Sequence, residues 1–328
     1  MAWESSRQRR GSKSCGRAEE ELLMRATREG FGEAIVELAK EDKRIVALTG
    51  DLTESVRLEE FEKKFPSRFF QCGVAEANMI GMAAGMALEG KIPFTATFGV
   101  FMPNRCLDHI RQSVCYNNAN VKMVATHCGL ITGEDGATHQ ALEDIAIMRA
   151  LPNTTVLVPC DFEEAKRVVK AAAKIEGPIY IRLTRPGTEN FSQGNFNVGK
   201  GVVLREGKDV SVIGCGPVLY QALLAAEKLK GEIDVEVINL HTIKPIDEEL
   251  IIKTAKKTDK IVTIEDHQIN GGLGSAVAEV LSGKYPVFVK RMGVQNRFGE
   301  SGKSDELLKA FGLDADSVVE AVRELYEL

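Results

Sequence analysis

The stretch VAEANMIGMAAGMALEG, residues 74–90, is the most informative part of this 328-residue sequence. It predicts a helix in which one acidic side chain, Glu76, precedes a run of Gly, Ala and Met. Such small side chains allow another backbone or a flat ligand to approach closely. A glutamate in apolar surroundings has a raised pKa and can share a proton with a ring nitrogen. A negative charge is also favoured at any helix amino terminus, so position alone leaves both roles of Glu76 open.

The segments around this helix alternate between β-branched runs and amphipathic helical patterns. Strands are predicted at residues 44–52, 92–100, 121–128, 154–160 and 178–186, with helices at 30–42, 75–90, 106–118, 141–151 and 162–175. The same alternation resumes after residue 207 and ends in two helices. Strands that alternate with helices are typical of an α/β fold with a mostly parallel sheet.

A polar stretch without apolar periodicity, GTENFSQGNFNVGKG at residues 187–201, is the best candidate for a linker. We therefore expect two domains, at residues 24–190 and 191–328, the second being a smaller α/β domain. Residues 1–23 form a separate tail with five positive charges, at Arg7, Arg9, Arg10, Lys13 and Arg17. Such a tail is most simply a disordered, solvated extension.

Composition excludes several classes of protein. The chain is 44% hydrophobic and 27% charged with a net charge of -5, which gives no general electrostatic case for binding nucleic acid or an anionic membrane. No apolar run approaches the roughly 18 residues of a membrane span, and the amino terminus lacks the apolar core of a secretory signal. We expect a cytoplasmic protein. Its seven cysteines contain no CxxC pair, which argues against zinc-ribbon or thioredoxin chemistry and favours reduced, buried thiols.

An aromatic pair ends the strand predicted at residues 92–100. In TFGVF, Phe98 and Phe101 lie three residues apart. Two such rings can hold a heterocycle by offset stacking. Two core phenylalanines give the same pattern, and on this pair alone the core interpretation is favoured.

The loop ATHCGLITGEDGATHQ, residues 125–140, follows a predicted strand and gathers four polar side chains, His127, Glu134, Asp135 and His139. Ligands of open parallel sheets bind at the carboxyl ends of strands. Two of the five histidines in the chain therefore suggest hydrogen bonding to a polyhydroxylated or phosphorylated substrate. The spacing matches no common metal-ligand pattern, so no metal site is predicted, and a purely local structural role for the histidines stays open.

Glycine-rich stretches in the chain do not match nucleotide-binding motifs. Gly214 and Gly216 follow a strand, but Leu219 occupies the third glycine position of the dinucleotide fingerprint. The stretch NGGLGSAVAEV at residues 270–280 is typical of a turn into a helix, and TGEDGATHQ lacks the GK[ST] of a P-loop.

Taken together, the sequence resembles the transketolase family over nearly the whole chain after residue 24. The similarity lies in TREGFGEAI, LTGDLTES, FFQCGVAEANMIGMAAGMAL, FTATFGVF, GEDGATHQ, LPNTTVLVPCD and EDHQINGGLG, whose order and spacing are highly specific. The resemblance implies a thiamine diphosphate enzyme with a pyrimidine-binding domain followed by a carboxyl-terminal domain. Such enzymes transfer a two-carbon ketol unit from a ketose phosphate to an aldose phosphate in the pentose phosphate pathway.

The resemblance also implies roles for single residues. Glu76 matches the catalytic glutamate that hydrogen-bonds the aminopyrimidine ring nitrogen and so promotes loss of the thiazolium C2 proton. Phe98 and Phe101 match the aromatic surface under that ring, although the family often adds a tyrosine where this chain has Asn104. Asp51 matches an aspartate near the cofactor. The remaining matches are to substrate-binding positions, for the sugar phosphate at Arg28, Ser55, His127 and Arg185, and for substrate hydroxyls at Asp135 and the catalytic His139.

One expected motif is missing from the chain. The family binds diphosphate and magnesium through a GDG followed by an asparagine roughly 25 to 30 residues later, and no such pattern occurs here. The resemblance therefore implies the second half of a split enzyme, active only with a separate amino-terminal subunit that supplies the magnesium ligands. Because the site lies between chains in this family, we expect a two-fold α2β2 heterotetramer that contains a dimer of this chain.

Three alternatives stay open at this point. A 1-deoxyxylulose-5-phosphate synthase and the β subunit of a 2-oxo acid dehydrogenase share the two-domain layout. The phosphate-binding set weighs against the dehydrogenase, whereas separation from the synthase rests mainly on family likeness. The third alternative is a non-catalytic dimerising or regulatory subunit, against which the retention of Glu76 and of the loop from His127 to His139 argues.

Overall fold

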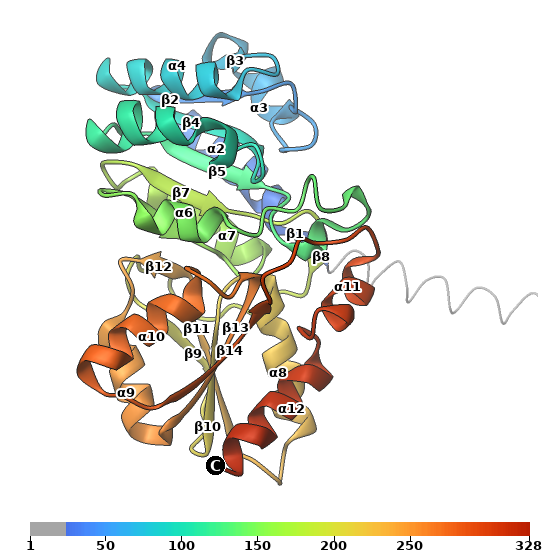
Figure 1. Cartoon of the computed structure of the whole chain (residues 1–328). Helices are drawn as coiled ribbons and strands as arrows, with labels where there is room; N and C mark the ends of the chain where they lie inside the picture. The colour runs from blue at the N-terminus through green and yellow to red at the C-terminus, as the bar shows by residue number, and fades with distance from the viewer. Residues whose placement is uncertain (1–23) are drawn as a thin grey trace, which may run out of the picture.

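The computed structural model describes residues 24–328, which form two α/β lobes (Figure 1). The first lobe is built on a seven-stranded sheet with the order β12-β6-β7-β5-β4-β2-β3. All neighbouring strands in it are parallel except β12, which pairs antiparallel with β6. The strands are β2 (Ile45–Thr49), β3 (Phe69–Gln71), β4 (Ile92–Phe98), β5 (Lys122–Thr126), β6 (Thr155–Leu157), β7 (Ile179–Arg182) and β12 (Thr242–Lys244).

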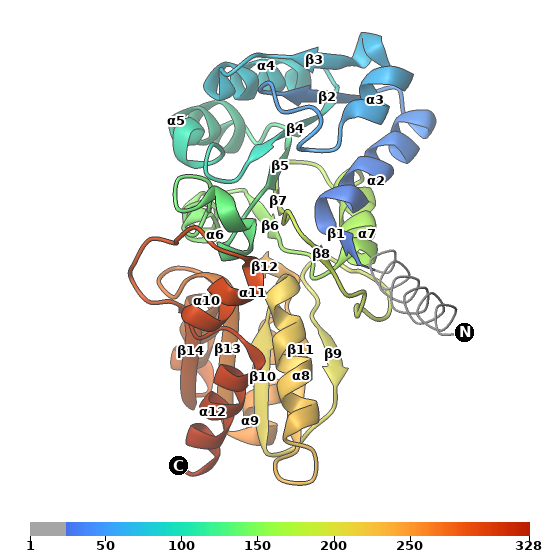
Figure 2. The same ribbon diagram turned by 90° about the vertical axis from the view of Figure 1, so that its right-hand side faces the viewer.

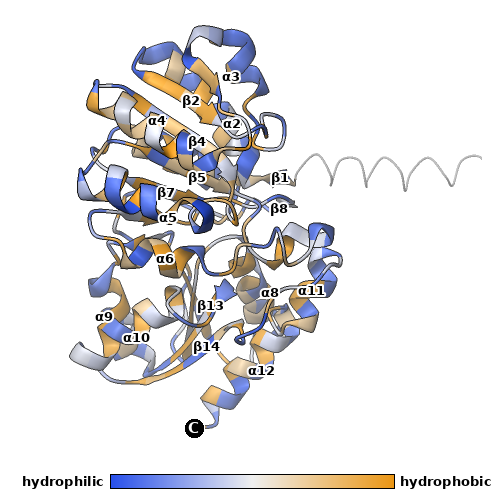
Figure 3. Cartoon of the chain, turned by 45° about the horizontal axis from the view of Figure 1, so that its top comes forward, coloured by the Kyte–Doolittle hydropathy of each residue, from blue (hydrophilic) through white to orange (hydrophobic). Residues whose placement is uncertain are grey.

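Helices cover both faces of this sheet because its central strands are apolar on both sides, as parallel sheets require. Strand β2 is orange, that is hydrophobic, along its length in Figure 3. One core unites strand residues such as Phe94 with α2 (Thr27–Glu41), α3 (Glu59–Lys64) and α7 (Phe162–Ala172). On the opposite face lie the helices α4 (Glu76–Leu88), α5 (Leu107–His109), its continuation η3 (Ile110–Tyr116) and α6 (Asp144–Ala150). Short 3-10 turns complete the lobe at η1 (Pro66–Arg68), η2 (Asn104–Cys106) and η4 (Leu130–Asp135).

The second lobe has a five-stranded sheet with the order β14-β13-β10-β11-β9, in which only β9 is antiparallel to its neighbour. Its strands are β9 (Val202–Arg205), β10 (Val210–Gly214), β11 (Val235–Asn239), β13 (Lys260–Gln268) and β14 (Phe288–Val294). The turn η5 (Pro217–Leu219) leads into α8 (Tyr220–Lys228), which packs on one face with α12 (Ala315–Tyr326), and α9 (Glu248–Thr258) and α10 (Leu273–Lys284) pack on the other. Helix α11 (Ser304–Ala310) contacts η4 of the first lobe.

The two lobes are joined by more than the linker. Strand β12 comes from the second half of the chain but extends the sheet of the first lobe (Figures 1 and 2). Across the junction the backbone N–H groups of Leu130 and Ile131 donate to the carboxylate of Asp266, at 2.8 and 3.3 Å. The loop after β5 is therefore fixed by the second lobe, which matters because this loop carries several candidate site residues.

The α/β class, the mostly parallel sheet and the smaller second α/β lobe are confirmed. Elements that the sequence did not predict are short or lie at edges, namely α3, β3, β9 and the two-stranded pair β1 (Arg25–Ala26) with β8 (Gly187–Thr188). The domain boundary near residue 190 stays a prediction, and the basic tail lies outside the described residues. No helix within residues 24–328 is both long and apolar enough to cross a membrane.

Candidate active site

Most candidate residues follow the carboxyl ends of five adjacent parallel strands, β7, β5, β4, β2 and β3, whereas Arg28 lies in the first turn of α2. Asp51 comes after β2, Glu76 after β3, Phe98 ends β4, His127 follows β5 and Arg185 follows β7. Because the carboxyl ends of parallel strands meet at one edge of the sheet, segments more than a hundred residues apart in sequence converge there.

Glu76 opens α4, where the unpaired N–H groups of the first turn favour a negative charge. Its side chain is almost completely buried, with 1% exposed. Both carboxylate oxygens accept hydrogen bonds from Nη1 of Arg105, each at 2.9 Å. A Cβ added to Gly50 would lie 3.1 Å from the carbonyl oxygen of Gly73 and 3.4 Å from Cγ of Glu76, so the backbone at Gly50 passes close to the glutamate.

The two phenylalanines form one aromatic group rather than parts of separate cores. The rings of Phe98 and Phe101 are stacked, with centroids 5.6 Å apart and planes 14° apart. His127 stacks on Phe98 at 3.8 Å, and the His139 ring meets both phenylalanines edge-on at 6.1 and 5.8 Å. The guanidinium carbon of Arg105 lies 4.3 Å from the centroid of Phe101, so this group also reaches the partner of Glu76.

Three arginines, Arg28, Arg57 and Arg185, lie near His127, and Arg185 also faces the carboxylates of Glu134 and Asp135. Burial, reinforced by the charges of Arg28 and Arg185, lowers the pKa of His127 to about 3, so its imidazole is neutral at pH 7. Burial and then Arg57 lower the pKa of Arg28 to about 10, which still leaves its guanidinium charged. Nη1 of Arg28 donates to the carbonyl of Ser55 at 2.8 Å. Clustered cations around a neutral histidine are a favourable environment for an anion.

Several buried polar atoms in this region have no hydrogen-bond partner among residues 24–328, including Nε of Arg28, Oγ1 of Thr132 and Oε1 of Gln140. Buried polar groups are rarely left unpaired in folded proteins, so such atoms point to a ligand or ordered water. Arg185 donates through Nη1 to the carbonyl of Thr132 at 2.9 Å and lies 3.7 Å from the carboxylate of Asp135. The substrate set expected from the sequence therefore lies in one neighbourhood.

Asp51 and His139 occupy the more open parts of this edge. Asp51 has a positive φ of 64°, and its backbone N–H donates to Oε1 of Gln71 at 2.6 Å, which fixes the turn after β2. Nδ1 of His139 lies 2.9 Å from Oγ1 of Thr138. Asn104 is exposed at the start of η2, next to Arg105.

Sequence reasoning missed Arg105 and Arg57. Among the non-glycine residues that the structure describes, seven have positive φ, and Arg57 is the single one that is not Asn, Asp or His. Its φ of 65° marks a strained conformation of the kind that collects at functional sites. Neither arginine had a sequence signal, because an isolated arginine in a polar loop is ordinarily surface charge.

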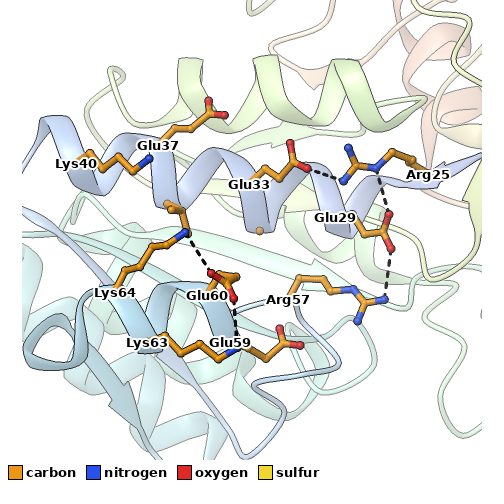
Figure 4. A pocket seen from close by; sticks show the side chains of 12 residues that line it. Arg25, Glu29, Glu33, Glu37, Lys40, Arg57, Glu59, Glu60, Lys63 and Lys64 are labelled. Carbon is orange, nitrogen blue, oxygen red and sulfur yellow. Dashed lines mark hydrogen bonds and ion pairs between the residues drawn. The ribbon is translucent and has the colours of Figure 1, made fainter. Parts of the chain in front are cut away.

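A charged hollow of about 430 Å³ lies between α2 and α3 (Figure 4). Its positive and negative side chains are equal in number and form ion pairs such as those of Glu29 with Arg25 and Arg57. Such a hollow has little net charge to attract a ligand, and it meets the candidate site only at Arg57. Among residues 24–328 no group of three or more His, Cys, Asp or Glu side chains could hold a metal ion.

The thiols near the site are not activated nucleophiles. Burial raises the pKa of Cys72, and burial together with the negative charge of Glu76 raises the pKa of Cys106 to about 12. Burial also raises the pKa of Cys128. A thiol rather than a thiolate is therefore present at neutral pH, which agrees with the structural role expected of these cysteines.

Two family models and several known proteins are similar to this chain. The families described as "Transketolase, pyrimidine binding domain" and "Transketolase, C-terminal domain" match residues 24–189 and 199–318. A transketolase C-terminal section of Methanocaldococcus jannaschii is 47% identical over 92% of this chain and 96% of its own length. A solved split-gene transketolase, described as an inactive β4 tetramer, is 48% identical with a TM-score of 0.87 over 92% of this chain and 99% of its own.

This chain belongs to the transketolase family and corresponds to the carboxyl-terminal section of its members. Human transketolase is 41% identical over 92% of this chain, which spans only 49% of the human protein. Members of this family depend on thiamine diphosphate.

The residues present fit the pyrimidine end of that cofactor. Phe101 offers one face to a planar group, as the position of the Arg105 guanidinium shows. The buried Glu76 carboxylate stands beside that face as a hydrogen-bond acceptor. A flat ring that carries a nitrogen donor needs these two features together.

Proposed function

We propose that this chain is the carboxyl-terminal subunit of a transketolase that moves a two-carbon ketol unit between sugar phosphates in the pentose phosphate pathway. The observation that carries the proposal is the continuity of the site. A buried carboxylate, a stacked aromatic group and a cluster of arginines follow one another along a single sheet edge, with the Phe98–His127 stack as the link. The end of the site at Glu76 suits a heterocycle, and the end at the arginines suits an anionic substrate.

On the cofactor side, Glu76 holds a proton between its carboxylate and the ring nitrogen of the aminopyrimidine. Phe98 and Phe101 support the ring, and Asp51 borders it from the turn after β2. Thiamine diphosphate, when bound, supplies the electron sink for breaking the carbon–carbon bond of the ketose. The positive amino terminus of α4 favours a negative side chain at Glu76.

On the substrate side, Arg28, His127 and Arg185 bind the phosphate, with Ser55 fixing Arg28. A neutral His127 contributes a hydrogen bond rather than charge, and the two arginines contribute the charge. Asp135 and His139 contact substrate hydroxyls, and His139 is placed to hold or move a hydroxyl proton. The orphaned Nε of Arg28 supports an anion at this place.

The chain is proposed to act with a separate amino-terminal subunit in an α2β2 assembly. Apolar side chains are exposed on and beside α4, at Val74, Met82, Leu88, Leu107 and Tyr116. Exposed apolar groups of this kind, next to the opening of a site, mark an interaction surface. The solved relative described as an inactive β4 tetramer supports the idea that such a chain assembles with itself but lacks activity alone. We place the magnesium and diphosphate ligands on the partner.

Reconstitution tests the proposal. The isolated chain should show neither tight binding of thiamine diphosphate nor ketol transfer, because a stack and one hydrogen bond together give about millimolar affinity or weaker. Adding a separately expressed amino-terminal transketolase subunit with magnesium and cofactor should restore transfer from xylulose 5-phosphate to an aldose phosphate. Robust transfer by this chain alone would refute the split-enzyme proposal, and an inert reconstituted complex would favour the non-catalytic alternative.

A further inference from the structure

Arg105 makes both contacts that the proposed cofactor ring needs. Its planar guanidinium lies over Phe101, with its carbon 4.3 Å from the ring centroid. The same group donates to both oxygens of Glu76 at 2.9 Å. An aminopyrimidine is also planar, stacks on an aromatic face and, once its ring nitrogen is protonated, donates to a carboxylate. The guanidinium and the ring therefore compete for one aromatic face and one carboxylate.

The two members of this ion pair differ in how they are held. Glu76 is buried at the start of a 13-residue helix, with 1% of its side chain exposed. The side chain of Arg105 is 48% exposed and comes from the short turn η2. Arg105 can turn out to solvent without leaving a buried cation unpaired, whereas Glu76 stays in place. The arginine is the member that can leave, and the carboxylate is the fixed binding group.

We propose that Arg105 closes the pyrimidine site of the cofactor-free chain by occupying the place of the aminopyrimidine, and that it must swing out before the cofactor binds. This inference rests on the proposed function and adds a means of regulation to the same site. In the closed state Glu76 has a counter-charge, so the buried carboxylate is not left unpaired while no cofactor is bound. The cofactor then meets only the open fraction of the molecules, which weakens its apparent affinity by that fraction.

The test is the affinity of the assembled complex for thiamine diphosphate, measured by isothermal titration calorimetry with saturating magnesium. Arg105→Ala should bind the cofactor about 3- to 10-fold more tightly than wild type, because a half-exposed ion pair and a cation–π contact together hold the closed state only modestly. Arg105→Lys should fall between the two, since lysine keeps the charge but has no plane to stack on Phe101.

Arg44→Ala is the matched control. Arg44 also pairs with a carboxylate, Asp42, but it is exposed and lies at the amino end of β2, whereas the candidate site lies at the carboxyl ends of the strands. Its cofactor affinity should equal that of wild type. Weaker or unchanged binding by Arg105→Ala, in a complex whose wild type binds normally, would overturn the closure proposal alone. If the wild-type complex binds no cofactor and Glu76→Gln does not change its turnover, the proposed function is overturned as well.

Discussion

Two arginine–carboxylate pairs in this molecule have the same chemistry and opposite surroundings. Arg182 and Asp144 meet at 2.9 Å inside the first lobe, with 3% and 0% of their side chains exposed. Arg182 also donates to the carbonyls of Ala141 and Asp266, and Asp144 accepts from the hydroxyl of Tyr180. Burial is the largest influence and lowers the pKa of Arg182, but Asp144 together with Cys128, Asp266 and Tyr180 outweighs it, so the pKa is raised.

The pair of Arg105 and Glu76 is buried on one side only. Its arginine donates to the carboxylate from a single nitrogen and otherwise contacts a ring that a ligand could use as well. A pair enclosed on all sides is locked in place, because removing either member leaves a buried, uncompensated charge. A pair with one exposed member can exchange that member for a ligand. The comparison therefore separates an internal support of the fold from a binding site.

The largest effect is expected at the half-exposed pair of Arg105 and Glu76. Glu76→Gln in the assembled enzyme should lower turnover about 10²- to 10⁴-fold, because glutamine cannot take up the proton that the ring nitrogen shares. The free energy of unfolding should change little, since Arg105 turns to solvent when its partner is lost. Steady-state kinetics and urea unfolding measure the two quantities on the same preparation. Near-normal turnover in the purified mutant complex would refute the catalytic assignment of Glu76.

At the enclosed pair of Arg182 and Asp144, the main expected effect is on the stability of the fold. Asp144→Asn leaves Arg182 buried without its counter-charge and should lower the free energy of unfolding by about 3–5 kcal/mol. The measurement is urea unfolding followed by circular dichroism. As a control, Asp42→Asn removes the carboxylate of the exposed pair with Arg44 and should cost about 0–1 kcal/mol. Equal losses in the two variants would show that the enclosure of Arg182 has no energetic consequence.

The same contrast explains what the sequence could and could not predict. The strands, the main helices and Glu76 at the start of α4 follow from local apolar periodicity and motif order, which a sequence carries directly. Neither pair follows from it, because Asp144 with Arg182 and Glu76 with Arg105 are tertiary contacts between separate elements. The expected boundary places Thr242 in the second domain, because nothing in the local sequence indicates that it pairs with Leu157 of the first lobe.

Loss of one phosphate contact should have an intermediate effect. Arg185→Ala should weaken binding of phosphorylated sugars by roughly 1.5–3 kcal/mol, the size of one charge-assisted hydrogen bond, with less effect on an unphosphorylated donor. The KM values for a matched pair of donors, with and without phosphate, measure the difference. Arg44→Ala serves again as a distant arginine control. Equal losses for both donors would contradict phosphate recognition by Arg185.

The last prediction concerns His127, whose effect develops gradually with pH. The folded pKa of about 3 lies below the ordinary value of 6.5, because the ring is buried and faces Arg28, Arg185, His139 and Arg57. As the pH falls through 6.5, the unfolded chain takes up a proton that the folded chain does not, so stability is lost progressively between pH 6.5 and about 3.

One such proton changes the free energy of unfolding by at most about 1.4 kcal/mol per pH unit. In His127→Gln this contribution is gone, so urea unfolding at pH 7, 6, 5 and 4 should give a shallower decline than in wild type. The slopes are compared rather than the absolute stabilities, which cancels the cost of the substitution itself and the titration of groups common to both proteins. His109→Gln, at an exposed histidine, should keep the wild-type slope. Identical slopes for wild type and His127→Gln would show that His127 is not held neutral, and the phosphate site would then have a third cation at mildly acidic pH.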